Sequence, residues 1–230
     1  MKITAALLAI CPSLLMLFYV RKRGKGTDKP LYLFFLIALI GALMGPAAYV
    51  FETVFDYALV SILASYKVYS FLASFIEAAF IEELLKLIAL NYVSYRFGKY
   101  YKTLFDGIIF SVCVALGFAV LENLLYVFIY SSNSVETALL RAITPGHFCF
   151  SIFMGLFYSE AKKYQHNYPG IFYRYVSLSL LVPVLIHGLY DYCLIEGGQI
   201  LTVLFFVLLV FLYAFSFVTI KKRSKTLQFI

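Results

Sequence analysis

Seven ionisable side chains fall inside long apolar runs of this chain: Glu82, Glu83, Lys86, Glu122, His147, His187 and Asp191. Each charge at bilayer depth costs roughly 2.5–3.5 kcal/mol on insertion scales. So many together are tolerated only where they face one another, a metal ion or trapped water. Carboxylates and imidazoles exchange protons and bind metal ions, so the sequence predicts that the chemistry of the chain lies at this buried set.

The composition defines the class of protein that must position these groups. Of the 230 residues, 63% are hydrophobic and 13% are charged, and the mean hydropathy is +0.90. These values lie outside the range of soluble globular domains. Because about 20 apolar residues are needed for each crossing, the chain has room for about seven spans and little else. We predict a single integral membrane domain over residues 1–230.

The apolar runs predict an all-α polytopic fold, since a helix satisfies its own backbone hydrogen bonds in lipid. The expected transmembrane helices are Ile3–Val20, Pro30–Val50, Tyr69–Tyr92, Leu104–Tyr130, Ala138–Ser159, Ile171–Ile195 and Leu201–Ile220. The first is expected to be retained rather than cleaved as a signal peptide, because its basic cluster follows the apolar run. Ala58–Ser65 stays outside these spans, and three alternatives are open: an extension of the third helix, an interfacial helix or a re-entrant segment.

Basic residues gather in alternate loops between these spans. The four groups are Arg21, Lys22, Arg23, Lys25 and Lys29; Arg96, Lys99 and Lys102; Lys162, Lys163 and Arg174; and Lys221, Lys222, Arg223 and Lys225. The positive-inside rule therefore predicts an N-terminus outside and a C-terminus in the cytoplasm. The net charge of +7 is explained at the membrane edges and requires no nucleic-acid partner. The four cysteines are spread singly and are expected to be free thiols.

The buried groups are expected to lie at similar depths. Counted from the predicted outer end of each helix, Glu122, His147 and His187 all lie about 12–13 Å deep. Asp191 is one turn nearer the surface than His187, and the Glu82–Glu83 pair is somewhat deeper. Four helices thus bring acids and imidazoles to one layer, which we expect to open outward.

Spacing within the helices supports this convergence. His187 and Asp191, like Glu82 and Lys86, are four residues apart and share a helix face, whereas Glu83 points about 100° away from Glu82. A structural alternative is that Glu82 and Lys86 form an ion pair that only locks helix packing. A lone intramembrane histidine can likewise be a packing residue, but two at matching depth beside Glu122 favour a site.

Three short motifs give the chain a family resemblance. Residues 82–86 (EELLK) follow EExxK, residues 118–123 (FAVLEN) follow FxxxEN, and residues 187–191 (HGLYD) follow HxxxD. In their order, spacing and expected depth these motifs resemble the PrsW family of intramembrane proteases, and the likeness is strongest over residues 76–195. That family is similar in turn to the CAAX-prenyl endoproteases and abortive-infection membrane proteins. Glu122 replaces the second-helix histidine of those relatives, and His147 is additional.

The resemblance implies an intramembrane endopeptidase in the bacterial cell membrane. Its expected substrate is a single-span anti-sigma factor, cut first near the extracytoplasmic face so that later proteolysis frees a sigma factor for stress transcription. The expected partners are this substrate and the lipid bilayer. The expected catalytic residues are Glu82, Glu83, Glu122, His147, His187 and Asp191, supported structurally by Lys86, Asn123 and Arg141.

Two mechanisms remain open for peptide hydrolysis, which needs an activated water, oxyanion stabilisation and an acid for the leaving amine. In the metal version, His147, His187 and Glu122 bind Zn²⁺, and Glu82 or Glu83 takes the proton from water. In the metal-free version, as in the CAAX-type relatives, a glutamate and a histidine activate the water directly. Residue types alone do not separate the two versions.

Two classes without proteolysis also remain. A proton-coupled transporter or channel would line its bundle with similar acids and histidines, although neither inverted repeats nor paired Gly/Pro-interrupted helices are visible. A seven-helix sensor without chemistry would use the charges as packing pairs, against which the excess of carboxylates over Lys86 argues.

Overall fold

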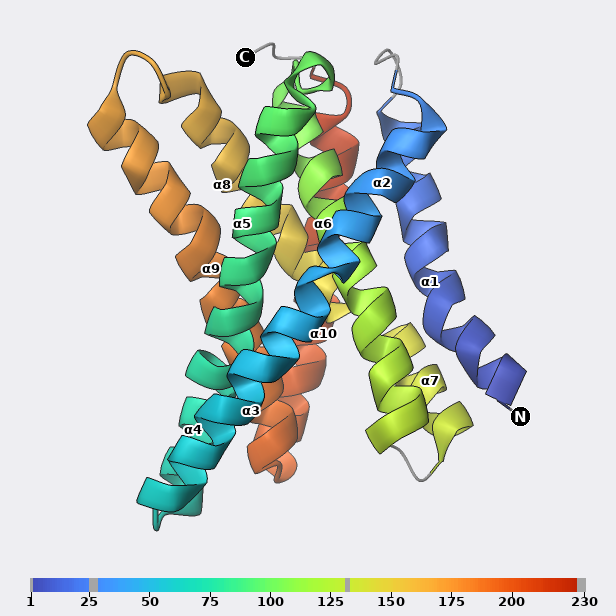
Figure 1. Cartoon of the computed structure of the whole chain (residues 1–230), viewed down its shortest axis with the longest axis vertical. Helices are drawn as coiled ribbons and strands as arrows, with labels where there is room; N and C mark the ends of the chain where they lie inside the picture. The colour runs from blue at the N-terminus through green and yellow to red at the C-terminus, as the bar shows by residue number, and fades with distance from the viewer. Residues whose placement is uncertain (1, 25–28, 131–132, 227–230) are drawn as a thin grey trace.

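Helices make up nearly all of the computed structural model, which describes residues 2–24, 29–130 and 133–226 (Figure 1). Lys25 of the predicted first basic group lies outside these residues. The α-helices are α1 (Lys2–Arg23), α2 (Leu31–Ala42), α3 (Met44–Ile62), α4 (Tyr66–Leu72), α5 (Ile81–Arg96), α6 (Leu104–Leu125), α7 (Ser134–Ile143), α8 (Gly146–Tyr164), α9 (Pro169–Glu196) and α10 (Gln199–Arg223). Two π-helical segments, η1 (Ala73–Phe80) and η3 (Tyr126–Tyr130), and a short 3₁₀ turn, η2 (Gly98–Tyr100), complete the elements.

The predicted polytopic helical fold is confirmed. Six segments are long and apolar enough to cross a membrane: Lys2–Arg23, Leu31–Ile62, Leu104–Ile129, Ser134–Tyr164, Pro169–Glu196 and Gln199–Arg223. A seventh helical segment runs from α4 through η1 to the end of α5. It is comparably long, and it is less apolar than the other six because it carries the charged residues Glu82, Glu83 and Lys86. The chain is thus a multi-pass membrane protein of about seven spans.

The second span is longer than predicted. All three alternatives for Ala58–Ser65 are wrong, because residues 58–62 continue α3 and the chain becomes extended only at Leu63. From Ala47 to Leu63 the sequence contains neither proline nor glycine, so nothing ends the helix earlier. At about 48 Å, Leu31–Ile62 exceeds the hydrocarbon thickness of about 30 Å. A helix of this length must tilt or protrude, and α2 and α3 indeed cross the bundle diagonally (Figure 1).

The predicted continuous helix Ala138–Ser159 is wrong, because the chain breaks at Thr144 and Pro145. Proline has no N–H to donate and disfavours helical backbone at the preceding residue. Side chains donate to two carbonyls at the break. Tyr213 donates its hydroxyl to the carbonyl of Ile143 at 2.8 Å, and Tyr190 donates to that of Thr144 at 3.2 Å. These bonds allow a broken helix to persist inside the bundle.

The centre of the bundle is α6, most of whose residues are buried. It packs against α1, α2, α5 and α8. Its approach to α2 is close because both helices carry glycine at the contact. A Cβ on Gly117 would overlap the backbone of Ala38, and one on Gly41 would overlap that of Val114. Small residues at such contacts let two membrane helices approach closely.

We therefore expect Gly117→Val to destabilise the bundle. The added side chain has no free space at the α2–α6 contact, and overpacking of this kind costs about 1–3 kcal/mol or more. The measurement is thermal unfolding in detergent. Gly98→Val is the matched control, since a Cβ on Gly98 meets nothing within 4 Å. Equal melting temperatures for the two variants would contradict the close approach.

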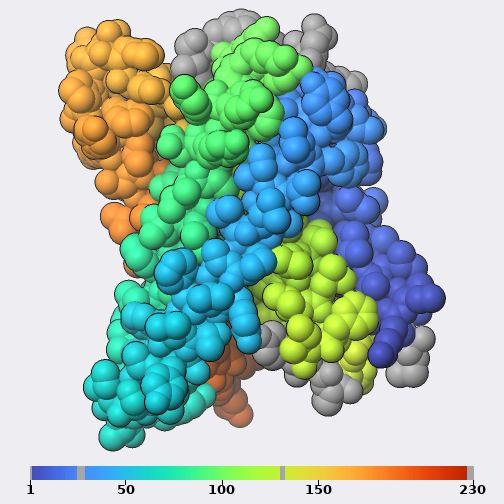
Figure 2. All heavy atoms as spheres, in the orientation of Figure 1, coloured from blue at the N-terminus to red at the C-terminus, as the bar shows by residue number. Residues whose placement is uncertain are grey.

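The two ends of the bundle differ in charge. The α5–α6 and α8–α9 connections, the facing ends of α1 and α2 and the last turn of α10 lie at one end. The first turn of α1, the α3–α4 turn and the α9–α10 turn lie at the other (Figure 1). The described residues of all four basic groups named from the sequence therefore belong to the first end, which we call the basic end. On the face shown in Figure 2, α2 and α3 run diagonally from the basic end, with α5 on one side and the lower part of α6 on the other.

Candidate active site

Helix α5 supplies a compact set of three charges. Lys86 donates to Oε2 of Glu82 at 2.9 Å and to Oε1 of Glu83 at 2.8 Å. The glutamates lie four and three residues before the lysine, so both helix positions neighbour it although they point in different directions. All three side chains are almost completely buried. The ion pair expected from Glu82 and Lys86 is present, and Glu83 shares it.

Irregular helical turns flank this part of the site. The π-helical segment η1 ends at Phe80, directly before the turn that carries Glu82 and Glu83. A second π-helical segment, η3, begins at Tyr126, one turn after Glu122. A π-turn adds a residue to the helical turn and so rotates the neighbouring residues about the helix axis, and such turns are frequent at functional sites.

His147 lies in the first turn of α8, directly after the break at Pro145. Its Nδ1 accepts a hydrogen bond from Lys86 at 3.0 Å, because an ammonium can only donate. Its Nε2 is therefore free to donate to Glu122, which it contacts closely. Glu122 also pairs with Arg141 at 2.6 Å, and Arg141 donates to the side-chain oxygen of Asn123 at 2.5 Å. Asn123 and Arg141, two of the supporting residues expected from the sequence, thus lie on the Glu122 side of His147.

His187 is held between two carboxylates. Its Nδ1 lies 3.0 Å from Oε1 of Glu83, and its Nε2 lies 3.1 Å from Oδ2 of Asp191. The ring of Phe150 stacks on the imidazole with 4.6 Å between centroids. Pro183, one turn earlier in α9, removes a backbone donor at this depth and favours a bend there. The ring of His187 is thereby fixed in plane and orientation.

Four side chains bring potential metal ligands together. Glu82, Glu83, His147 and His187 each offer a ligand atom, and these atoms all lie within 4.8 Å of one another. Oε2 of Glu83 is buried and has no hydrogen-bond partner among the described residues. Each imidazole turns its other nitrogen to a carboxylate, which is the usual support of a metal-bound histidine. The donor set therefore fits a divalent cation such as zinc.

The structure brings all six predicted catalytic residues into one connected cluster. Of the expected zinc ligands, His147 and His187 belong to the four-residue group, and Glu122 instead contacts the opposite nitrogen of His147. The sequence interpretation missed Glu52, which lies just beyond the predicted end of the second span at Val50. Glu52 lies in α3, close enough to Glu82 and Glu122 for their charges to act on it. An apolar run that continues past Glu52 to Leu63 is the signal that could have identified it.

Exposure divides the cluster into a buried interior and a more open edge. The side chains of Glu83 and His187 are 1% and 3% exposed, whereas those of Asp191, Glu122 and Arg141 are 23%, 18% and 25% exposed. Asp191, Glu122 and Arg141 therefore form the more exposed edge of the cluster.

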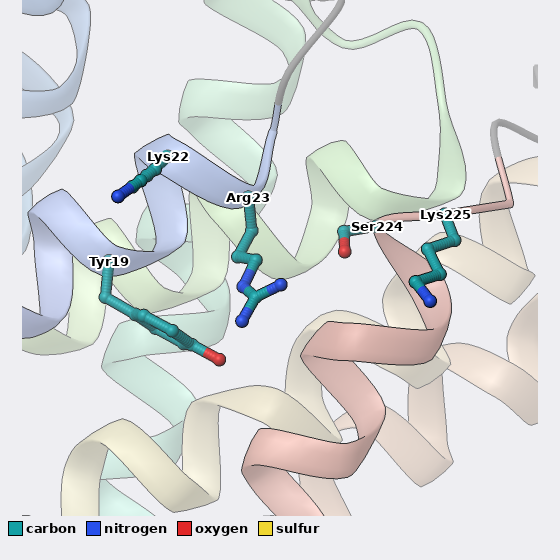
Figure 3. A pocket seen from close by; sticks show the side chains of 5 residues that line it. All are labelled: Tyr19, Lys22, Arg23, Ser224 and Lys225. Atoms are coloured by element: carbon teal, nitrogen blue, oxygen red, sulfur yellow. The ribbon is translucent and has the colours of Figure 1, made fainter.

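A separate cavity of about 420 Å³ lies at the basic end, away from this cluster. Tyr19, Lys22 and Arg23 of α1 line it together with Ser224 and Lys225, which follow α10 (Figure 3). Its lining holds cations and hydroxyls but neither a carboxylate nor an imidazole. It therefore lacks the residues that hydrolysis requires, and the charged cluster is the candidate active site.

A helical membrane protein with acids and imidazoles gathered among its spans has the features of an intramembrane hydrolase. The family model described as "PrsW family intramembrane metalloprotease" matches residues 29–219. Because the match covers most of the chain, the protein belongs to the PrsW family of intramembrane proteases. It is accordingly a peptide hydrolase of the bacterial membrane, which separates it from transporters and from sensors without chemistry.

Curated relatives agree with this family. A protein named Protease PrsW from Clostridioides difficile (strain 630) is 30% identical over 230 residues, covering 96% of this chain and 92% of the relative. A second, from Oceanobacillus iheyensis, is 29% identical and covers 94% of each chain. A third, from Bacillus subtilis (strain 168), is 37% identical over 130 residues, or 54% of this chain and 55% of the relative. No solved structure gives a significant match.

Proposed function

We propose that this protease makes the first cut in a single-span anti-sigma factor. The cut lies near the extracytoplasmic face of the membrane and starts the release of a sigma factor for stress transcription. The observation that carries the proteolytic step is the group formed by Glu82, Glu83, His147 and His187. There the two glutamates can accept a proton from water, and the two histidines can bind a metal ion or donate to the peptide. The group lies among membrane helices, where a substrate helix could approach it from within the bilayer.

The charge of the two ends supports the side of the cut. Under the positive-inside rule the basic end faces the cytoplasm, so that the N-terminus lies outside and the C-terminus inside. Glu122 and His187 lie about 12 and 13 Å from the non-basic ends of their helices, at Tyr130 and Glu196, and each lies about 27 Å from the basic end. These two residues of the cluster are thus nearer the non-basic end, where the juxtamembrane segment of a substrate would emerge.

The residues divide among the roles that hydrolysis needs. His147 and His187, with Glu82 as a third ligand, would hold zinc, which supplies Lewis acidity and lowers the pKa of water when bound. Glu83 accepts the proton from the attacking water, because its Oε2 has no hydrogen-bond partner among the described residues. Glu122 and Asp191 orient the two imidazoles. Arg141 neutralises Glu122 and leaves it as an acceptor for His147.

One observation favours the metal-free alternative. The Lys86 ammonium already neutralises the two glutamates and contacts His147. In that version Glu83 and a histidine activate water directly, and His187 with Asp191 stabilises the oxyanion. Both versions use nearly the same side chains, so their difference lies in the response of cleavage to chelation.

The position of the cut tests the proposed function. Purified protein in liposomes is expected to cleave a single-span anti-sigma factor in the segment that leaves the membrane at the non-basic end. Mass spectrometry of both products locates the bond. The control substrate has the same span but lacks that segment, and it should remain intact. Cleavage on the basic side, or equal cleavage of both substrates, would contradict the proposal.

A further inference from the structure

Lys86 occupies the centre of the group that offers metal ligands. Its ammonium donates to Glu82, Glu83 and His147 at 2.9, 2.8 and 3.0 Å. An ammonium has three protons to donate, so these bonds use all of them. The ring of Phe118 lies on another side, with its centroid 4.4 Å from Nζ. Three of the four potential metal ligands are thus already bound to one cation of the chain itself.

We propose that Lys86 is a built-in counter-cation that competes with the metal ion for this site and thereby sets its metal affinity. The inference rests on the metal version of the proposed function. The lysine holds the Glu82–Glu83 pair together when no divalent cation is bound, and it leaves the carboxylates when one binds.

Charge is the first reason for this competition. Two adjacent carboxylates buried among apolar helices require a compensating positive charge. Either the ammonium or a divalent cation provides it. Both cannot occupy the space between Glu82, Glu83 and His147, because like charges a few ångströms apart repel strongly where water is excluded.

The lone pair of His147 is the second reason. Nδ1 of His147 accepts from Lys86, and the lone pair that accepts a proton donor is the one that would bind a metal ion. Its other nitrogen is engaged by Glu122. Metal binding through Nδ1 therefore requires that Lys86 release it. The four-carbon stem of lysine is flexible enough to allow such a movement.

The chain offers a matched control for this residue. Lys29 is also buried and pairs with a buried carboxylate, that of Asp106, at 2.5 Å. This pair lies at the basic end, away from the cluster. Methionine at either position removes the charge and preserves the length of the side chain. The variants Lys86→Met and Lys29→Met therefore differ only in which carboxylates lose their cation.

Metal binding and thermal stability together test the proposal. Lys86→Met is expected to bind Zn²⁺ at least about tenfold more tightly than the wild type, measured by chelator competition on the full chain. Its melting temperature should fall in chelator and recover when zinc is added, because the metal ion replaces the lost charge. Lys29→Met should also melt lower, but zinc should not restore it. The wild type should respond only weakly to either treatment.

Two results would overturn the inference: zinc affinity in Lys86→Met no higher than in the wild type, or a melting temperature that zinc restores equally in both methionine variants. If Lys86→Met does not fold without metal, Lys86→Gln carries the same expectations, while Lys86→Arg, which keeps the charge, should gain no affinity. Cleavage by a wild type that binds no zinc would reject the inference and leave the protease intact. A gain in zinc affinity in Lys86→Met, together with a wild type that binds zinc but cleaves no substrate, would support the inference and reject the proposed function.

Discussion

Glu83→Gln is expected to abolish cleavage of a single-span substrate while leaving the fold intact. Glutamine preserves the size of the side chain and its contact with His187, but it cannot accept a proton from water. Loss of a general base typically costs about 10²–10⁴-fold in rate. The measurement is the rate of product formation in liposomes, with circular dichroism and melting temperature as checks of folding.

Glu160→Gln is the matched control for this substitution. Glu160 also lies on a membrane helix and pairs with a lysine, Lys163, at 2.6 Å. It is thirteen residues beyond His147 in α8, or about 20 Å towards the basic end. Its variant should cleave at the wild-type rate. Equal rates for Glu83→Gln and Glu160→Gln would remove Glu83 from the reaction.

Metal removal should stop cleavage without unfolding the protein. A bound metal ion is worth several kcal/mol of transition-state stabilisation, which corresponds to a loss of about a thousandfold or more. The fold should survive, because Lys86 remains to neutralise Glu82 and Glu83. The measurement compares the cleavage rate and the melting temperature before chelation, after chelation and after addition of zinc.

The two mechanisms give opposite results in this experiment. Recovery of cleavage with zinc, and failure to recover with magnesium, would support the ligand set of His147, His187 and Glu82, since imidazole nitrogen suits zinc and not magnesium. Undiminished cleavage by protein shown to contain no metal would instead assign the reaction to the glutamates and histidines alone.

Much of the helical architecture follows from the sequence because a membrane helix requires only length and apolarity. The same criterion does not reveal a break in a helix that lies inside an apolar stretch. Thr144, Pro145 and Gly146 lie within an apolar stretch long enough to span the membrane, so hydropathy predicts one helix where the chain forms two. Proline followed by glycine is a breaker signal, and here it places His147 in the first turn of a new helix rather than in the middle of one.

The site was predictable within each helix and less so between helices. Helical phase puts His187 and Asp191 on one face, and Lys86 within reach of both glutamates. Pairing across helices depends on packing, which a single sequence does not encode in its periodicity. The contact of Glu122 with the outer nitrogen of His147, and the return of Arg141 to Glu122 and Asn123, become visible only in three dimensions. Glu52 was missed because its helix continues beyond the expected membrane boundary.

The most direct test of the central claim is a structure of Glu83→Gln with an uncut single-span substrate bound. We predict that the scissile peptide lies between α5 and the two histidines, entering past Glu122 and Asp191. A scissile bond lying elsewhere on the protein, away from His147 and His187, would contradict the assignment of this cluster as the cleaving centre.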